Sequence, residues 1–245
     1  MFDHVTLRVA DLPAVERRFQ SLLDQLAFDE THSTRAIAMW GDFALAQTED
    51  DAHLTRGAHV AFAARSNEAV EAFWEAGVAA GLADHGPPGA RPHYEDDYYA
   101  AFVRDEHGNT FEAVHRAANR RGGHVDHVAI RVADLGAAVG FYRGVADAAG
   151  FSLREEGEED ATFGDDSGGL LTLFAGSPTQ QLHLAFPGDD DAVRAFFSTL
   201  VAAGHRPNGE PGERARYHPG YFVAYVLDPD GNNIEVVDHH DGRGA

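Results

Sequence analysis

Apolar and polar residues alternate along the first stretch of the chain and then change to a helical spacing. Residues 2–9 alternate and are rich in β-branched side chains, which predicts a strand. Asp11 is a suitable helix N-cap, and Pro13 suits a first helical turn. The next apolar positions fall on one face of a helix: Val15, Phe19, Leu22, Leu23 and Leu26. The opening of the chain is therefore predicted to be a strand followed by an amphipathic helix.

The pattern continues with short strands around a second helix. Strands are predicted at residues 35–47 (two strands broken near Gly41), 58–64, 98–104 and 110–114. Ser66 or Asn67 can cap the second helix, and Gly81 is a suitable stop. The last two strands are predicted to form a hairpin. Together these elements make two consecutive βαβββ units.

The whole pattern then repeats, so the chain is one sequence unit written twice. Residues 2–12 return as residues 125–135, with eight of eleven positions identical. Two further segments return at nearly the same shift, 59–62 as 183–186 and 105–112 as 228–235. The stretch between the copies is small, polar and Gly-rich, as linkers are. We predict a first domain at residues 1–118, a linker at 119–123 and a second domain at 124–245.

Composition excludes several classes of function. Nineteen basic residues, all arginine, stand against forty acidic ones, so the net charge is −21. This field repels phosphates, which argues against nucleic acid or an anionic membrane as a partner. Without lysine and cysteine, a lysine Schiff base, a Walker-type phosphate loop and thiolate-bound metals are excluded. No signal peptide or apolar run of transmembrane length is present, and we expect a cytoplasmic protein that acts on a small molecule.

Three short motifs of the repeat resemble the vicinal oxygen chelate superfamily of glyoxalases, bleomycin-resistance proteins and extradiol dioxygenases. They are an opening Asp-His-Val, a mid-unit His-Val-Ala-Phe and the terminal Asp-Pro-Asp-Gly-Asn-Asn-Ile-Glu. The resemblance implies an α+β fold of tandem domains, in which paired βαβββ units form a cupped mixed sheet around a divalent metal. It also implies ligands on the first, fifth and eighth strands of each copy: His4, His59 and Glu112, and again His127, His183 and Glu235.

The residue types themselves support a metal site. Two imidazoles and one carboxylate leave coordination positions open, as in non-haem Fe(II) sites. Both copies keep all three residues while their other histidines differ, which favours ligands over structural histidines and surface carboxylates. We expect Fe(II), with Mn, Zn, Ni or Co as alternatives. The ligands of one site could come from one domain, or His4 could join His183 and Glu235 in an exchanged arrangement.

The second copy carries further residues that resemble the signature of ring-cleaving extradiol dioxygenases: His218, Tyr225, Asp228, Pro229, Gly231 and Glu235. The resemblance implies that His218 and Tyr225 handle substrate protons. The match is partial, because Ala224 replaces a larger apolar residue and Arg216 a small or β-branched one. A further histidine expected upstream of His183 also has no candidate. The alternatives are a polar loop residue for His218 and a packed strand aromatic for Tyr225.

Five residues are candidates for substrate binding: Thr6, Arg8, Arg131, Tyr94 and Tyr217. Thr6 and Arg8 share a strand face with His4, since strand side chains alternate. The two arginines could anchor an anionic group, or simply pair with carboxylates of this acidic chain. The tyrosines precede the penultimate strand of each copy and could wall a pocket.

The leading prediction is a divalent-metal enzyme that chelates a small substrate through vicinal oxygens, with an Fe(II) extradiol-type dioxygenase favoured. One alternative is a glyoxalase-type isomerase or lyase, or a thiol transferase. Another is a binding protein that sequesters a drug, as bleomycin-resistance proteins do. We expect either a monomer with an internal pseudo-dimer or a homodimer.

Overall fold

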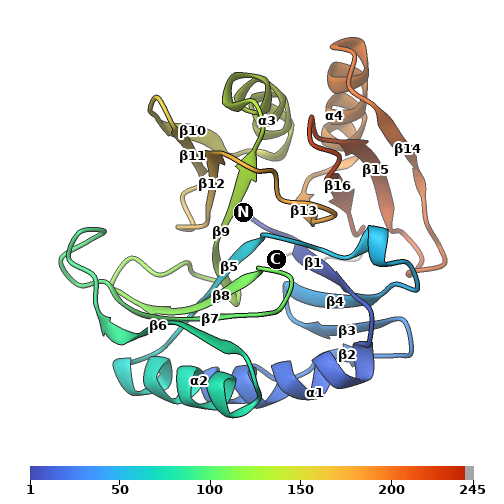
Figure 1. Cartoon of the computed structure of the whole chain (residues 1–245). Helices are drawn as coiled ribbons and strands as arrows, with labels where there is room; N and C mark the ends of the chain where they lie inside the picture. The colour runs from blue at the N-terminus through green and yellow to red at the C-terminus, as the bar shows by residue number, and fades with distance from the viewer. Residues whose placement is uncertain (241–245) are drawn as a thin grey trace.

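The computed structural model describes residues 1–240, in which two eight-stranded mixed sheets stand side by side with four α-helices (Figure 1). Elements of the first half are β1 (His4–Val9), α1 (Leu12–Leu23), β2 (His32–Ser33), β3 (Ile37–Trp40), β4 (Phe43–Gln47), β5 (His59–Ala63), α2 (Asn67–Ala79), β6 (Ala83–Ala90), β7 (Tyr99–Arg104) and β8 (Thr110–His115). Elements of the second half are β9 (Val125–Val132), α3 (Leu135–Ala149), β10 (Ser152–Glu156), β11 (Asp160–Gly164), β12 (Leu170–Ala175), β13 (His183–Pro187), α4 (Asp190–Ala202), β14 (Pro207–Glu213), β15 (Phe222–Leu227) and β16 (Asn233–Asp238). Short 3₁₀ turns lie at Asp24–Leu26 and Asp51–His53.

The predicted α+β fold of repeated βαβββ units is confirmed. The side chain of Asp11 accepts a hydrogen bond from the backbone of Ala14 and caps α1, and that of Ser66 accepts from Ala69 and caps α2. The sequence pattern missed β6, whose Gly-Pro-Pro-Gly segment carries no strand signal. It forms a strand because it pairs with β7 at the sheet edge, with two irregularities in register.

Each sheet combines one unit from each half of the chain. The strand order of one sheet is β14-β15-β16-β13-β1-β4-β3-β2, so the first unit pairs with the fourth. The order of the other is β10-β11-β12-β9-β5-β8-β7-β6, so the second unit pairs with the third. The predicted limits at 118 and 124 therefore divide the sequence repeat, whereas the sheets are assembled across that division (Figure 1).

Antiparallel pairs of first strands join the units at the middle of each sheet. In the β1–β13 pair, His4 lies opposite Ala185 and Thr6 lies opposite His183. In the β5–β9 pair, His59 lies opposite Ala129, and His127 lies opposite Ala61. Each pair thus places the histidine of one unit diagonally across from that of its partner, on the same face of the sheet.

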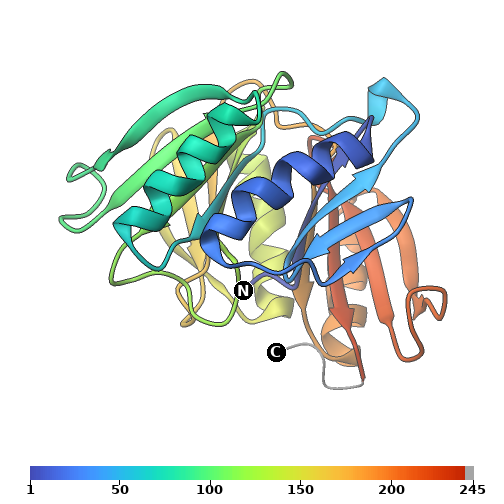
Figure 2. The ribbon, with the colours of Figure 1, turned by 90° about the horizontal axis from the view of Figure 1, so that it is seen from below.

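The helices follow the opposite rule, because each helix packs against the other helix of its own half. Helix α1 contacts α2, and α3 contacts α4, as Figure 2 shows for the first pair. Aromatic side chains fill the core between the sheets, with the Phe43 and Phe62 rings 5.0 Å apart at an interplanar angle of 88°. Each helix pair therefore holds together the two units of one half of the chain, which belong to different sheets.

Two buried threonines fasten the segments that lead from one sheet to the other. The hydroxyl of Thr55 accepts a hydrogen bond from the backbone of Arg8 (2.9 Å) and donates one to the carbonyl of Gln181 (2.9 Å). Thr179 makes the equivalent pair of bonds, and both threonines are fully buried. Each threonine thereby joins a backbone group of β1 or β9 to a backbone group of a crossover segment.

No helix within residues 1–240 has the length and apolar character that crossing a bilayer requires.

Replacing Thr55 by Val should destabilise the protein by about 2–4 kcal/mol, because two buried backbone groups lose their hydrogen-bond partner while the side-chain shape is kept. Thr199→Val on the exposed face of α4 is the control and should change stability by less than about 0.5 kcal/mol. The free energy of unfolding in urea measures both. Equal midpoints for the two variants would show that the crossover bonds contribute nothing.

Candidate metal centres

His4, His183 and Glu235 come together on one face of the first sheet, and we call this group the first centre. Nε2 of His183 lies 2.9 Å from Oε2 of Glu235 and 3.0 Å from Nε2 of His4. Nε2 of His4 lies 3.9 Å from the same carboxylate oxygen. The three donor atoms thus converge, although the residues come from opposite ends of the chain.

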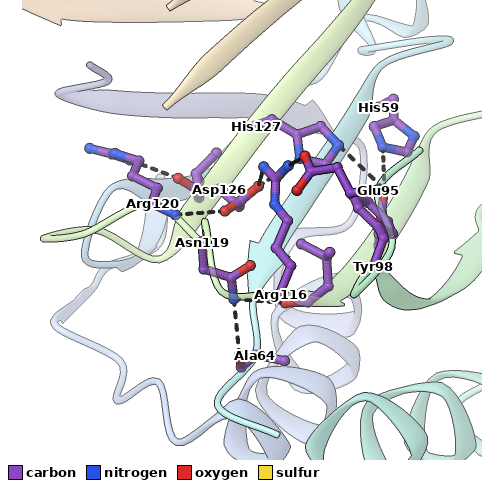
Figure 3. Close-up of polar contacts among 12 residues, drawn as sticks. His59, Ala64, Glu95, Tyr98, Arg116, Asn119, Arg120, Asp126 and His127 are labelled. Atoms are coloured by element: carbon purple, nitrogen blue, oxygen red, sulfur yellow. Dashed lines mark hydrogen bonds and ion pairs between the residues drawn. The ribbon is translucent and has the colours of Figure 1, made fainter. Parts of the chain in front are cut away.

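His59, Glu112 and His127 form the equivalent group in the other sheet, the second centre (Figure 3). Oε2 of Glu112 lies 2.9 Å from Nε2 of His59 and 3.4 Å from Nε2 of His127. All six predicted ligand residues are therefore assembled, in the exchanged arrangement: His4 joins His183 and Glu235, and His127 joins His59 and Glu112.

The remaining ring nitrogens are held from behind. Nδ1 of His4 lies 2.7 Å from the carboxylate of Asp3, and Nδ1 of His127 lies 2.8 Å from that of Asp126. Nδ1 of His183 lies 3.1 Å from the backbone oxygen of Asn233. Such partners fix a histidine with its Nε2 lone pair directed at a metal.

Two tyrosines orient the glutamates. Tyr221 donates a hydrogen bond to Oε1 of Glu235 (2.6 Å), and Tyr98 donates one to Oε1 of Glu112 (2.5 Å). Burial and the nearby carboxylate raise the pKa of each phenol, so both hydroxyls stay protonated. Local sequence does not predict this role, although the matching positions of Tyr98 and Tyr221 in the repeat are a signal that points to it.

Charges within the second centre stabilise each other. Burial alone would raise the pKa of Glu112, but hydrogen bonds and charges from His127 and His59 lower it to about 2. Burial alone would lower the pKa of His127, but Asp126 and Glu112 raise it to about 9. Without metal, the second centre is therefore held by an ion pair at neutral pH.

Local symmetry identifies the residue that faces each glutamate across its centre. Glu235 lies beside Ala185 of β13. The local two-fold relation between β1 and β13 exchanges Ala185 with Thr6, and the residue beside Thr6 in β4 is Ala44. Ala44 is therefore the symmetry-related counterpart of Glu235. In the other sheet, Glu112 lies beside Ala61, the local two-fold relation between β5 and β9 exchanges Ala61 with Ala129, and the residue beside Ala129 is Thr172. Where symmetry would place a second carboxylate, the first centre has the methyl group of Ala44 and the second centre has the hydroxyl of Thr172. Each centre therefore offers three strong donors.

The donor sets fit a divalent first-row metal ion. Two neutral imidazoles and a carboxylate suit Fe, Mn, Zn, Ni and Co alike. The ring nitrogens and carboxylate oxygens that face away from the centre are largely occupied by protein partners, which leaves Nε2 and Oε2 for the ion. Neither Ala44 nor Thr172 supplies a strong donor, so an ion at either centre would keep positions for a further ligand on this side, which we call the open side of the centre.

The predicted substrate residues are placed differently from one another. Thr6 is buried on the His4 face, whereas Arg8 is partly exposed and Arg131 exposed. Tyr94 and Tyr217 are 60% and 55% exposed, and their ring centroids lie 5.1 and 5.0 Å from those of the tyrosines that hold the glutamates.

The two predicted proton-handling residues also differ in their relation to the first centre. Tyr225 lies directly opposite Glu235 in the β15–β16 pair, with its ring 6.3 Å from that of His183. His218 is linked to the centre through other side chains. Its Nε2 lies 3.0 Å from Nδ1 of His239, whose Nε2 lies 2.8 Å from the carboxylate of Asp3.

The same repeat positions carry a different pair of residues at the second centre. Arg116, which replaces His239, bonds Asp126 at 2.8 Å, and it also pairs with Glu95, which replaces His218 (Figure 3). A permanently charged guanidinium thus stands behind the second centre, and two imidazoles stand behind the first.

Comparisons with known proteins agree with this fold. Residues 124–236 match the family model described as Glyoxalase/Bleomycin resistance protein/Dioxygenase superfamily. A crystal structure of a point mutant of glyoxalase I from Zea mays has a TM-score of 0.70 at 21% identity, covering 98% of this chain and 94% of that one. A candidate dioxygenase from Bacillus subtilis has a TM-score of 0.66 at 11% identity, covering 99% and 86%.

A third solved structure, a glyoxalase/bleomycin resistance protein from Albidiferax ferrireducens, is 31% identical over 47% of this chain and 99% of that one, with a TM-score of 0.43. The comparison with curated proteins gives no match.

Metal stoichiometry tests the exchanged arrangement. His4→Ala and His183→Ala should each remove one metal per chain, and the double variant should still remove only one because both side chains belong to the first centre. His4→Ala combined with His59→Ala should remove both metals. Elemental analysis after reconstitution measures this. The opposite result for the two double variants would mean that each centre is built within one half of the chain.

The ion pair of the second centre predicts a pH dependence for the metal-free protein. Wild type should exceed Glu112→Gln in free energy of unfolding most clearly between about pH 4.5 and 6.5. The difference should shrink as the pH falls from about 4.5 to about 2, because the carboxyl of Glu112 is protonated near 4.5 in the unfolded chain and only near its lowered pKa of about 2 in the folded protein. It should also shrink from pH 6.5 toward about 9, as His127 with its raised pKa loses its proton. Chemical denaturation across pH measures the difference, and a constant difference would contradict the ion pair.

Proposed function

Because residues 124–236 match the model of the Glyoxalase/Bleomycin resistance protein/Dioxygenase superfamily, we propose that the chain is a metal-dependent enzyme whose small substrate binds through two neighbouring oxygen atoms, with Fe(II) extradiol-type dioxygenation as the reaction. The observation that carries this proposal is the three-donor centre. Ala44 and Thr172 stand where symmetry would place a second carboxylate, so an ion held by three protein donors would keep coordination positions for two substrate oxygens and dioxygen.

The first centre is the better candidate for the reaction. Bound Fe(II) would supply Lewis-acid and oxygen-activating chemistry, held by His4, His183 and Glu235. Burial and the charge of Glu235 raise the pKa of Tyr225, so its hydroxyl keeps its proton and can donate a hydrogen bond to an anionic oxygen of the substrate. The second centre has Phe102 at this position and offers no hydroxyl there.

A glyoxalase-type isomerase or lyase is the second candidate, and similarity to glyoxalase I over nearly the whole chain favours it. That similarity concerns the fold, and function depends on the site. The isomerase would need water or a further residue to complete its metal, whereas the dioxygenase uses the open positions directly. Drug sequestration has less support, because it does not need two intact sets of metal ligands.

Oxygen uptake with catechols by the Fe(II)-reconstituted protein tests the proposed reaction. Glu235→Ala should abolish uptake together with one bound metal, whereas Glu112→Ala should remove the other metal and leave most of the uptake. Uptake that follows Glu112 instead would assign the reaction to the second centre. No uptake from protein that holds iron at both centres would refute dioxygenation and direct assays to isomerase and lyase substrates.

Filling the open side of the centre is a sharper test. Ala44→Glu should add a fourth donor, keep the metal and lower oxygen uptake by about 100-fold or more, because the substrate's position is taken. Thr172→Glu is the matched control at the second centre and should leave uptake nearly unchanged. Metal content and circular dichroism show whether each variant is loaded and folded. Full activity in loaded Ala44→Glu protein would rule out the open side as the substrate site.

A further inference from the structure

The mouths of the two centres differ at two of three positions that the repeat aligns. The first centre carries Arg216, Tyr217 and Tyr225, and the second carries His93, Tyr94 and Phe102. One tyrosine is shared, so the first centre gains a guanidinium and a second hydroxyl. Arg216 is also a position where the sequence departs from the extradiol signature.

Contacts lead from Arg216 inward to the first centre. Its Nη2 donates a hydrogen bond to the hydroxyl of Tyr217 (3.1 Å), and its guanidinium lies 4.9 Å from the centroid of that ring. The ring of Tyr217 packs edge-on against Tyr221, which holds Glu235. The exposed guanidinium is thereby fixed at the outer end of an aromatic pair whose inner end touches a candidate ligand.

Tyr225 forms the other side of this mouth. It lies opposite Glu235 in the sheet, and it is close enough to Tyr217 for that phenol to contribute, after burial and Glu235, to raising the pKa of Tyr225. The guanidinium of Arg216 and the two phenol hydroxyls therefore lie together beside the first centre.

The second centre lacks this set. Phe102 replaces Tyr225 and has the guanidinium of Arg91 5.7 Å from its ring, while the ring of His93 lies 4.2 Å from that of Tyr94. Glu95 adds a negative charge beside these residues and pairs with Arg116. The second centre thus has a phenyl ring in place of the Tyr225 hydroxyl and an imidazole in place of the Arg216 guanidinium.

Charge decides what the first centre can recognise. The chain carries a net charge of −21, so a negatively charged ligand is repelled at long range and needs a local cation. A guanidinium with fixed orientation matches the two oxygens of a carboxylate, and phenol hydroxyls add further donors.

We propose that Arg216 is a specificity-determining residue of the first centre, which selects diol substrates that carry a carboxylate in addition to their vicinal oxygens. This inference rests on the proposed chelation of the substrate, and it adds the class of substrate and the group that recognises it. Arg216 binds the carboxylate, the hydroxyls of Tyr217 and Tyr225 face the substrate between that group and the centre, and the vicinal oxygens reach the open side beside Ala44.

Ligand binding without turnover tests the proposal. Protein carrying Glu112→Ala, which retains only the first centre, is loaded with redox-inert Zn(II) and titrated calorimetrically with catechol and with 3,4-dihydroxybenzoate. The carboxylated diol should bind about tenfold more tightly than catechol. Arg216→Gln should remove this advantage, and Arg216→Glu should reverse it. Catechol affinity should stay within about twofold in both variants, and His93→Gln is the matched control that should change neither affinity.

The outcomes distinguish the role of Arg216 from the chelation of the substrate. If catechol binds but the carboxylate gives no advantage, or if Arg216→Gln weakens both ligands equally, the role of Arg216 is refuted while chelation stands. If neither diol binds zinc-loaded protein, chelation itself fails and the inference fails with it. An advantage that also declines with added salt would support recognition by charge.

Discussion

The free edge of the first strand in each βαβββ unit is the constraint on which the rest of this structure depends. An unpaired edge leaves backbone groups without partners, and β1 and β5 satisfy them by antiparallel pairing with β13 and β9. Because the partners are copies of one another, the pairing brings two first-strand histidines together on one face. The last strand of one of the two paired units then supplies the glutamate, so a chain that closes its sheets also assembles its two centres.

One scaffold thus presents two centres with the same inner residues and different surroundings. Asp3 and Asp126 hold equivalent histidines, yet the first is contacted by His239 and the second by Arg116. The open sides differ as well, with Ala44 at one centre and Thr172 at the other. The repeat therefore preserves what binds an ion and varies what surrounds it, which is the pattern expected when two copies serve different purposes.

Much of this arrangement could be predicted from the sequence, since most elements have clear periodicity and caps, and the repeat identifies the six residues of the two centres. The edge strand β6 could not, because its glycines and prolines become a strand only through β7. The choice of partner unit was also open, because all four units offer a similar first strand and nothing local distinguishes them. The roles of Tyr98 and Tyr221 could not be predicted either, since their bonds to the glutamates depend on loop conformation.

The assembly of each sheet from both halves has a consequence for synthesis on the ribosome. The first half emerges with β1 and β5 complete and their partner edges still untranslated. Until β9 and β13 follow, two strand edges stand open to any other strand, including one from a neighbouring nascent chain. The contact between α1 and α2 is available at that stage and can hold the first half compact while it waits. The order of translation thus makes the helices the early scaffold and the two candidate metal centres the last parts to be completed.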